Sequence, residues 1–329
     1  MDISVIIPVF NSQDYLKRCL DSIFTQEFEG TFEVIMINDG STDGSIGILK
    51  EYEIIYDNLK ILDFNGNFSN AVARRKGMEV AEGDYIICVD SDDLLKQGTL
   101  QKLLNYKEGF GEPDVLIYDY ERHNGQVPIS SNINIKQIKI YDESCKGEIQ
   151  NLFMGACWNK MVKRSLLDDL IFGTFYMNNT EDLIYAFEVF LKAKKIITIP
   201  EAYYYYYVNP LSLSNNVNIV QHIKIQVIVF NTLSKIRKKY GDSLYFEPIF
   251  DYLKIGLIQS FFLNHIKNQL DDKLIQEFLV EYIGNVNEDR FLYVKKIIES
   301  FSFSCKEMLK FFGVINLCKI FFKNIRNEN

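Results

Sequence analysis

The sequence contains 329 residues, of which 47% are hydrophobic, a composition typical of a folded chain with a packed core. The formal net charge of −8 argues against general binding of nucleic acids, which requires a basic face. The six cysteines form no CxxC pair and no disulfide-framework spacing, which indicates reduced thiols.

Residues 3 to about 120 alternate between strand-like runs and stretches with helical spacing. Five runs are apolar on consecutive residues: ISVIIPVF, FEVIMIND, LKILDF, DYIICVD and DVLIYDY. Such runs, linked by helices, predict a Rossmann-like, mostly parallel α/β sheet covered on both faces. The first run starts at the N-terminus without a basic signal-peptide region, so a cytoplasmic location is expected.

Polar residues follow three of these runs. Asn11 follows the first strand, Asp39 the second, and a group of carboxylates the fourth. In such sheets, ligands bind at the carboxyl ends of the strands. Asp39 either accepts a hydrogen bond from a ligand or belongs to ordinary turn chemistry, and both interpretations stay open.

The segment Asp90-Ser91-Asp92-Asp93 places three carboxylates within four residues, directly after a buried strand. Like charges at this spacing resist desolvation unless a cation lies among them. Oxygen ligands suit Mn²⁺ or Mg²⁺. The alternative is an acidic turn that caps the following helix.

Two further segments have both a functional and a structural interpretation. In NAVARRKG, Arg74 could bind phosphate oxygens, whereas three adjacent basic residues could also form a solvated helix face. In TEDLIYAFEVFL, Glu181 and Asp182 could present a general base or only occupy the first turn of a helix.

Several catalytic motifs are absent from the sequence. It contains no GxxxxGK[ST] loop and no GxGxxG, so neither an ATPase nor a dinucleotide dehydrogenase is supported. It also lacks the GxSxG elbow and HExxH.

Six segments, in order across about residues 3–215, resemble the family 2 glycosyltransferases with the GT-A fold. They are SVIIPVFN, INDGSTDGS, ARRKG, DYIICVDSDDLL, WNKMVKRSLL and TEDLIYAFEV. The resemblance implies a GT-A domain at 1–215, with a nucleotide-sugar half of about 1–105 and an acceptor half of about 106–215. The remaining residues, 216–329, are expected to form an α-helical C-terminal part.

The resemblance also implies a reaction. An inverting enzyme would move one sugar from a nucleotide-sugar, most often a UDP-sugar, with Mn²⁺ or Mg²⁺ as cofactor. The acceptor would be a hydroxyl of a glycan or lipid-linked molecule in the synthesis of bacterial cell-surface polysaccharide. No QxxRW motif is present, so single-sugar addition is expected in place of processive synthesis.

The resemblance implies a set of residues that bind the donor: Pro8, Val9, Phe10, Asp39, Arg74, Asp90 and Ser91. In this set Asp39 would hold the uracil ring, Asp90 would lie near the ribose or donor sugar, and Arg74 would lie near the phosphates. Phe68 stands where a Gly often precedes the helix, and Arg75 stands where the family usually has Asn.

The resemblance also implies the metal ligand and the acceptor side. Asp92 would bind the metal that bridges the diphosphate, and Asp182 would be the catalytic base. Four residues would shape the acceptor side: Trp158, Asn159, Lys160 and Glu181.

The C-terminal segment 306–326 combines a broad apolar surface with a basic side. It could dock on the preceding helices or on a second subunit in a homodimer. It could also lie on an anionic membrane, which would make the protein peripheral at the inner face of the cell membrane. Both interpretations stay open.

Two other functions are alternatives to a glycosyltransferase. A nucleotidyltransferase that makes nucleotide sugars would normally carry a Gly-rich basic loop, which SVIIPVFNSQDY lacks. A non-catalytic nucleotide-sugar-binding protein would keep the donor residues and have no transfer activity.

Overall fold

The computed structural model describes residues 1–123, 128–131, 135–145, 155–174, 181–208, 228–229, 231–233, 235–236 and 238–240. Contacts divide the chain into two compact units, Met1–Asn218 with Asn231–Ile249, and Ile219–Phe230 with Phe250–Asn329. The expected helical part is described only in short helical stretches between 228 and 240, and the segment 306–326 lies outside the described residues. Within the described part, no helix has the length and hydropathy needed to cross a bilayer.

The described part of the first unit contains one ten-stranded mixed sheet. Its strands are β1 (Ile3–Val9), β2 (Phe32–Asn38), β3 (Leu59–Asp63), β4 (Tyr85–Cys88), β5 (Leu94–Leu95), β6 (Val115–His123), β7 (Pro128–Ser131), β8 (Lys139–Tyr141), β9 (Lys160–Lys163) and β10 (Ile196–Tyr207). The helices are α1 (Gln13–Phe24), α2 (Ser45–Ile55), α3 (Asn70–Val80), α4 (Thr99–Gly109) and α5 (Glu181–Lys192), with a 3₁₀ turn, η2 (Arg164–Leu166).

The main path through the sheet runs β3-β2-β1-β4-β9-β6-β10-β5. Strands β1 to β4 pair in parallel, as do β6 and β10. The predicted mostly parallel α/β sheet is therefore confirmed. Strand β9 lies antiparallel between β4 and β6, and its residues belong to the segment WNKMVKRSLL.

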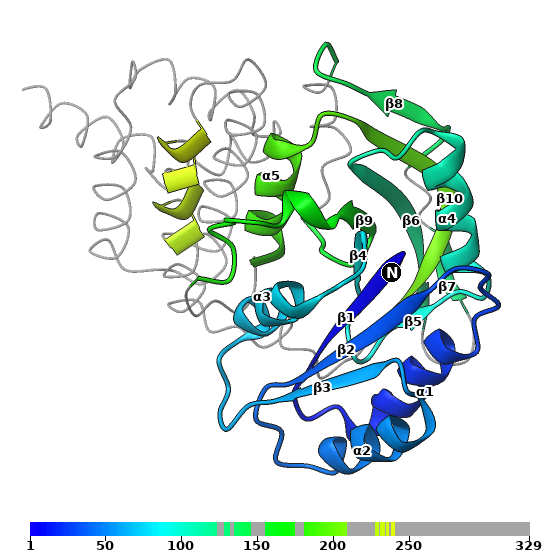
Figure 1. Ribbon diagram of the computed structural model, residues 1–329, viewed down its shortest axis with the longest axis vertical. Helices are drawn as coiled ribbons and strands as arrows, with labels where there is room; N and C mark the ends of the chain where they lie inside the picture. Colours follow the sequence, from blue (N-terminus) through cyan, green and yellow to red (C-terminus); the bar gives the residue numbers. More distant parts are fainter. Residues whose placement is uncertain are drawn as a thin grey trace, which may run out of the picture. The chain divides into compact units, whose positions relative to one another are not determined.

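Consecutive residues of β1, β2 and β4 are buried, so both faces of these strands are covered, since side chains alternate between the faces along a strand. Ile3, Val5, Ile7 and Val9 of β1 face the core that α1 shares. Ile6 faces the opposite side, where Gly77 of α3 packs against it. Figure 1 shows α1 and α2 on one side of β1 to β3 and α3 on the other.

Gly77 of α3 and Gly47 of α2 both lie inside helices, but only Gly77 is packed closely against neighbouring atoms. An added Cβ at Gly77 would lie 2.7 Å from Ile6 Cγ2 and 2.8 Å from Ile37 Cδ1, whereas at Gly47 it would meet nothing within 4 Å. We expect Gly77→Ala to lower the free energy of unfolding by about 1–3 kcal/mol. We expect Gly47→Ala to raise it by about 0.4–1 kcal/mol.

Urea unfolding of the two variants measures both changes. A Gly77→Ala variant at least as stable as the unmodified protein would contradict the close approach of α3 to β1 and β2.

Candidate functional site

The predicted donor residues come together at one edge of the sheet. Strands β2, β1 and β4 are neighbours, with Val9 opposite Asn38 and Ile6 opposite Cys88. Phe10, Asp39 and Asp90 follow the carboxyl ends of these strands. The structure therefore places these three residues at the edge where parallel sheets bind ligands.

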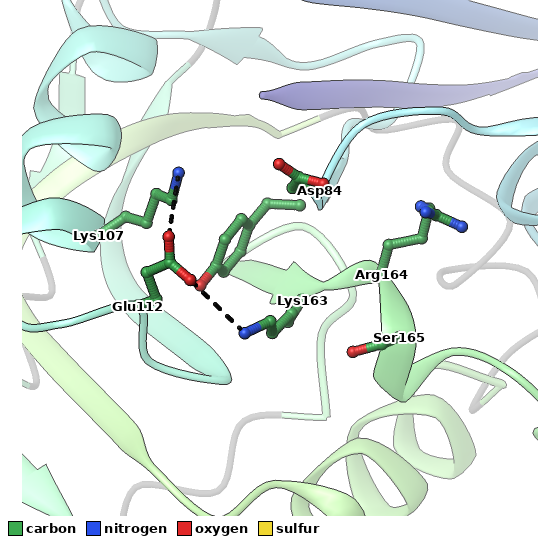
Figure 2. Close-up of a pocket in the computed structure, with 7 residues that line it drawn as sticks. Asp84, Lys107, Glu112, Lys163, Arg164 and Ser165 are labelled. Atoms are coloured by element: carbon green, nitrogen blue, oxygen red, sulfur yellow. Dashed lines mark ion pairs between the residues drawn. The ribbon is translucent and has the colours of Figure 1, made fainter. Parts of the chain in front are cut away.

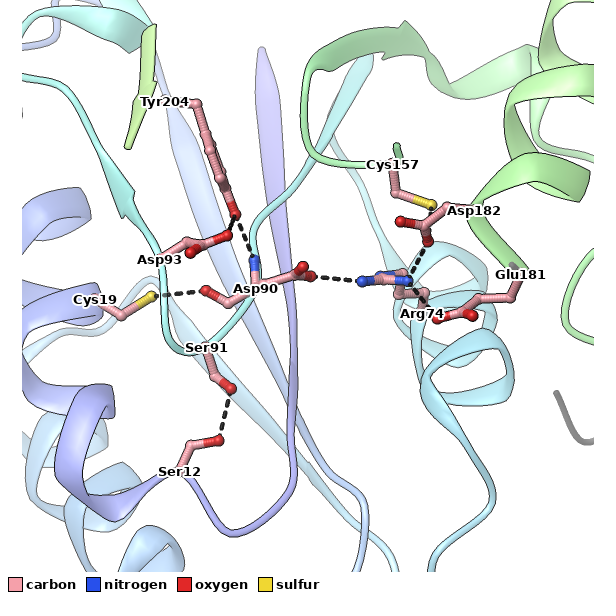
Figure 3. Close-up of polar contacts among 10 residues, drawn as sticks. All are labelled: Ser12, Cys19, Arg74, Asp90, Ser91, Asp93, Cys157, Glu181, Asp182 and Tyr204. Atoms are coloured by element: carbon pink, nitrogen blue, oxygen red, sulfur yellow. Dashed lines mark hydrogen bonds and ion pairs between the residues drawn. The ribbon is translucent and has the colours of Figure 1, made fainter. Parts of the chain in front are cut away.

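Arg74 of α3 is the centre of a buried ionic cluster at this edge. Its Nη2 lies 2.5 Å from Asp90 Oδ1, and its Nη1 lies 2.6 Å from Asp182 Oδ1 and 3.3 Å from Glu181 Oε1. Only 2% of the Arg74 side chain is exposed. One guanidinium thus joins α3, the loop after β4 and the first turn of α5 (Figure 3).

The cluster holds more negative than positive charge, with three carboxylates around one guanidinium. Burial raises the pKa of Asp90, while the charge of Arg74 opposes the change. Burial, and next the charge of Asp182, raise the pKa of Glu181 to about 7. Nη1 of Arg74 donates to two carboxylates and Nη2 to one, so among the described residues the second N–H of Nη2 and the buried Nε–H are left for the predicted phosphate contact.

The three basic residues of ARRKG have different environments. Arg75 donates from Nη1 to the carbonyl oxygens of Leu170 and Phe172, and from Nε to Glu79 at 3.0 Å. Lys76 pairs with Glu79, and half of its side chain is exposed. Of these three residues, Lys76 therefore forms a solvated helix face. Arg75 instead binds backbone carbonyl oxygens of the segment before α5.

The carboxylate of Asp93 is hydrogen-bonded to strand β10. It accepts hydrogen bonds from the Tyr204 hydroxyl at 2.7 Å and from the Tyr207 N–H at 2.7 Å. The Tyr204 hydroxyl also accepts a hydrogen bond from the Asp90 N–H. Asp93 therefore anchors the acidic loop to the sheet (Figure 3).

Asp92 differs from its two neighbours. Its half-buried carboxylate receives no hydrogen bond or ion pair from any other residue that the structure describes. Burial, and next the charge of Asp90, raise its pKa to about 6. Asp92 is the member of the acidic segment with oxygens available to a cation.

A divalent cation can be tested against this donor set. No group of three or more His, Cys, Asp and Glu side chains in the described part of the chain could hold a metal ion. Mg²⁺ commonly takes one or two protein carboxylates and completes its shell with phosphate oxygens and water. Asp92 therefore fits a cation that arrives together with a diphosphate, and does not fit a metal held by protein side chains alone.

Asp39 is held by the backbone that enters α3. Its Oδ1 accepts the Phe68 N–H at 2.8 Å and its Oδ2 accepts the Ser69 N–H at 2.9 Å. Burial raises its pKa. The side chain is 2% exposed, yet each oxygen retains a lone pair for a ligand N–H.

Before α3, Ser69 has a φ of 91° and Gly66 a φ of 155°, both in the region that favours glycine. The Phe68 ring is 49% exposed, and that of Phe10, on the neighbouring strand end, is 38% exposed. Pro8 and Val9 are buried inside β1, so of the predicted Pro8-Val9-Phe10 segment only Phe10 can offer its side chain to a ligand.

Ser91 links the acidic loop to the start of α1. Its hydroxyl lies 2.7 Å from that of Ser12, and the Ser12 N–H donates to Ser45. This contact places the predicted donor residue Ser91 beside the end of β1 (Figure 3).

The predicted acceptor-side residues lie mostly inside the protein. The Trp158 ring stacks on Tyr204, with centroids 4.7 Å apart, and is 8% exposed. Asn159 and Lys160 are each 1% exposed, and Lys160 Nζ donates to Asn159 Oδ1 at 2.5 Å and to the Ala156 carbonyl at 2.6 Å. These two side chains are therefore buried and hydrogen-bonded to each other, and are not exposed to an acceptor.

Sequence reasoning missed Tyr204 and Cys157. The run YYYYYV indicates a strand, but does not show that Tyr204 binds Asp93. Cys157 precedes Trp158, and its Sγ lies 3.0 Å from Asp182 Oδ1. No pattern in the sequence signals that contact, because it joins segments 25 residues apart.

A second polar pocket lies at the opposite end of β4, where Tyr85 begins the strand (Figure 2). Its lining residues are Asp84, Tyr85, Lys107, Glu112, Lys163, Arg164 and Ser165. Glu112 faces both Lys107, at 3.9 Å, and Lys163, at 3.8 Å, so one carboxylate lies between two ammonium groups. None of the predicted site residues lines this pocket.

Comparison with known proteins identifies relatives in bacteria. Poly(ribitol-phosphate) beta-glucosyltransferase of Bacillus spizizenii is 31% identical over an alignment of 219 residues that covers 63% of this chain and 32% of that protein. Poly(ribitol-phosphate) beta-N-acetylglucosaminyltransferase TarP of Staphylococcus aureus is 29% identical over an alignment of 256 residues that covers 75% of this chain and 73% of that one. The chain thus spans about a third of the first relative's length.

Solved structures share the fold. Residues 1–349 of S. aureus TarS align with a TM-score of 0.69 and 22% identity, over 87% of this chain and 81% of that one. The same fragment in complex with UDP-GlcNAc aligns with a TM-score of 0.66 and 21% identity, over 87% of this chain and 82% of that one.

A family model described as Glycosyl transferase family 2 matches residues 4–171. The match covers half of the chain and includes β1 to β4, the acidic segment and β9. With the GT-A arrangement of the sheet and the polar residues at its carboxyl edge, this match shows that the chain belongs to glycosyl transferase family 2.

Proposed function

We propose that this chain is a metal-dependent inverting glycosyltransferase that transfers one sugar from a UDP-sugar to a hydroxyl of a glycan or lipid-linked acceptor. The observation that carries the proposal is the Arg74 cluster, in which one buried guanidinium holds Asp90 and Asp182 at the ligand-binding edge. The relatives named as poly(ribitol-phosphate) glycosyltransferases, and the TarS complex with UDP-GlcNAc, support a role in bacterial cell-surface polysaccharide synthesis.

Asp182 is the proposed general base. Its Oδ1 receives Arg74 Nη1 and the Cys157 thiol, whereas its Oδ2 receives no hydrogen bond from the residues that the structure describes. The side chain is 25% exposed, so an acceptor hydroxyl can approach Oδ2 and transfer its proton there as it attacks the anomeric carbon. A single displacement of the diphosphate inverts that carbon, which passes through an oxocarbenium-like state.

The donor is proposed to lie along the ends of β2, β1 and β4. The free lone pairs of Asp39 would accept the uracil N–H, and the exposed Phe10 and Phe68 rings would contact the base. Asp90 and Ser91 would contact the ribose or the sugar. A divalent cation at Asp92 would stabilise the charge that develops on the departing diphosphate.

The proposal also includes contact with the membrane and the formation of a homodimer. A lipid-linked acceptor would place the protein at the inner membrane face through residues 306–326. Homodimer formation through that segment and the alternative docking on the preceding helices stay predictions.

The base is tested with Asp182→Asn, which keeps an oxygen for Arg74 and removes the proton acceptor. We expect the rate of sugar transfer to fall by about 10²–10⁴-fold, the usual contribution of a general base. UDP release from UDP-GlcNAc and UDP-glucose measures the rate, and the thermal shift with UDP confirms that the donor site survives. A variant with unchanged transfer would contradict the assignment, and a wild-type protein that binds UDP without transfer would indicate a non-catalytic binding protein.

The metal and donor sites are tested by the melting temperature with UDP, GDP and CMP, each with and without Mn²⁺. A ligand that binds only the native state at one hundred times its Kd stabilises that state by about 2.7 kcal/mol. We expect the largest shift with UDP and Mn²⁺, and loss of the Mn²⁺-dependent part in Asp92→Asn. Asp43→Asn, which changes a carboxylate in a different turn, is the matched control and should keep the shift. An equal shift with GDP or CMP would contradict the UDP donor, and a shift that persists in Asp92→Asn would contradict the metal ligand.

A further inference from the structure

We infer that Cys157 is a positioning residue for the reaction: its thiol donates a hydrogen bond to Asp182 Oδ1 and so leaves Oδ2 as the atom that takes the proton. This inference rests on the proposed function of Asp182 as the base. Cys157 acts through Asp182 and not through contact with the substrate.

The geometry fixes one carboxylate oxygen from two sides. Cys157 Sγ lies 3.0 Å from Asp182 Oδ1, and Arg74 Nη1 lies 2.6 Å from the same atom. Cys157 precedes β9, Arg74 belongs to α3 and Asp182 to the first turn of α5. Figure 3 shows the sulfur and the guanidinium approaching Asp182 from different directions. Two donors on one oxygen hold the carboxyl group against rotation.

The thiol is a proton donor here and not a thiolate. Cys157 is fully buried, and burial together with the charge of Asp182 raises its pKa well above the usual range. A thiol is a weak donor to neutral acceptors, but a hydrogen bond to an ionised carboxylate is stronger. The buried S–H therefore orients Asp182 without adding a charge.

Several other charged or titratable groups face Asp182: Arg74, Cys88, Asp90, Lys160 and Glu181. Burial lowers the pKa of Lys160 to about 8 and raises that of Cys88 to about 12. Replacement of any charged member would change the net charge of the cluster. Cys157 is the neutral donor in direct contact, so its replacement changes the orientation and hydrogen bonding of Asp182 and leaves the charges in place.

A positioning role and a space-filling role predict different effects on the kinetic constants. Loss of the thiol leaves Arg74 as the remaining donor of the pair on Asp182 Oδ1, so Oδ2 is less well oriented and kcat falls, while KM for the donor does not change. A residue that only fills space would lower stability, and an O–H in its place would not restore the rate.

The experiment compares Cys157→Ala, which removes the donor, with Cys157→Ser, which keeps an O–H in its place. Hydrolysis of UDP-GlcNAc and UDP-glucose is followed by UDP release, with water in the place of the acceptor hydroxyl. We expect Cys157→Ala to lower kcat about 10–100-fold, with KM for the donor unchanged. Cys157→Ser should restore most of the rate.

The contact itself is tested without activity. The S–H stretching band of Cys157, assigned as the band lost in Cys157→Ser, should move to higher frequency in Asp182→Asn, because a neutral amide accepts a weaker hydrogen bond. An unmoved band, or a kcat that is the same in Cys157→Ala and the wild type, would overturn the inference. If Asp182→Asn itself hydrolyses the donor at the wild-type rate, the proposed function has failed. If Asp182→Asn is inactive and Cys157→Ala keeps the wild-type kcat, only the inference has failed.

Discussion

The burial of one guanidinium among three carboxylates is the constraint on which the rest of the site depends. An arginine with 2% of its side chain exposed must be paired, because an uncompensated buried charge is strongly destabilising. Asp90, Glu181 and Asp182 supply that pairing from two segments far apart in the sequence. Helix α3, the loop after β4 and the start of α5 are therefore locked together, and α3 can reach this position because Gly77 lets it approach β1 and β2 closely.

The carboxylates of the site divide into those that the fold uses and those that it leaves available. Asp93 accepts hydrogen bonds from Tyr204 and Tyr207, and Oδ1 of Asp182 accepts them from Arg74 and Cys157. Asp92 and the Oδ2 of Asp182 receive no hydrogen bond from other described residues, and burial raises the pKa of Asp92. A cation bound with the donor, or an acceptor hydroxyl, would therefore find carboxylate oxygens to which no described residue donates a hydrogen bond.

The two departures from the family pattern have local physical explanations. Arg75 donates to the carbonyl oxygens of Leu170 and Phe172, and Glu188 accepts the N–H groups of Ile171 and Phe172, so this segment is held from both sides. The glycine-like conformation falls on Ser69, whose N–H binds Asp39. Phe68, which precedes Ser69, is about half exposed and does not bear the unusual backbone angle.

The sequence alone determined the alternating strands and helices, the α/β class and the carboxyl edge where the polar residues gather, since these follow from hydrophobic periodicity and strand direction. Its resemblance to the family also predicted site roles for Arg74, Asp90, Asp92 and Asp182, and these roles stay predictions. Only the tertiary structure decided that Arg74 binds carboxylates, that Asp93 belongs to β10, that β9 runs antiparallel between β4 and β6, and that Cys157 touches Asp182. The reason is that periodicity reports which face of an element is buried, whereas the partner of a buried polar atom depends on which distant segment the fold brings within hydrogen-bond distance.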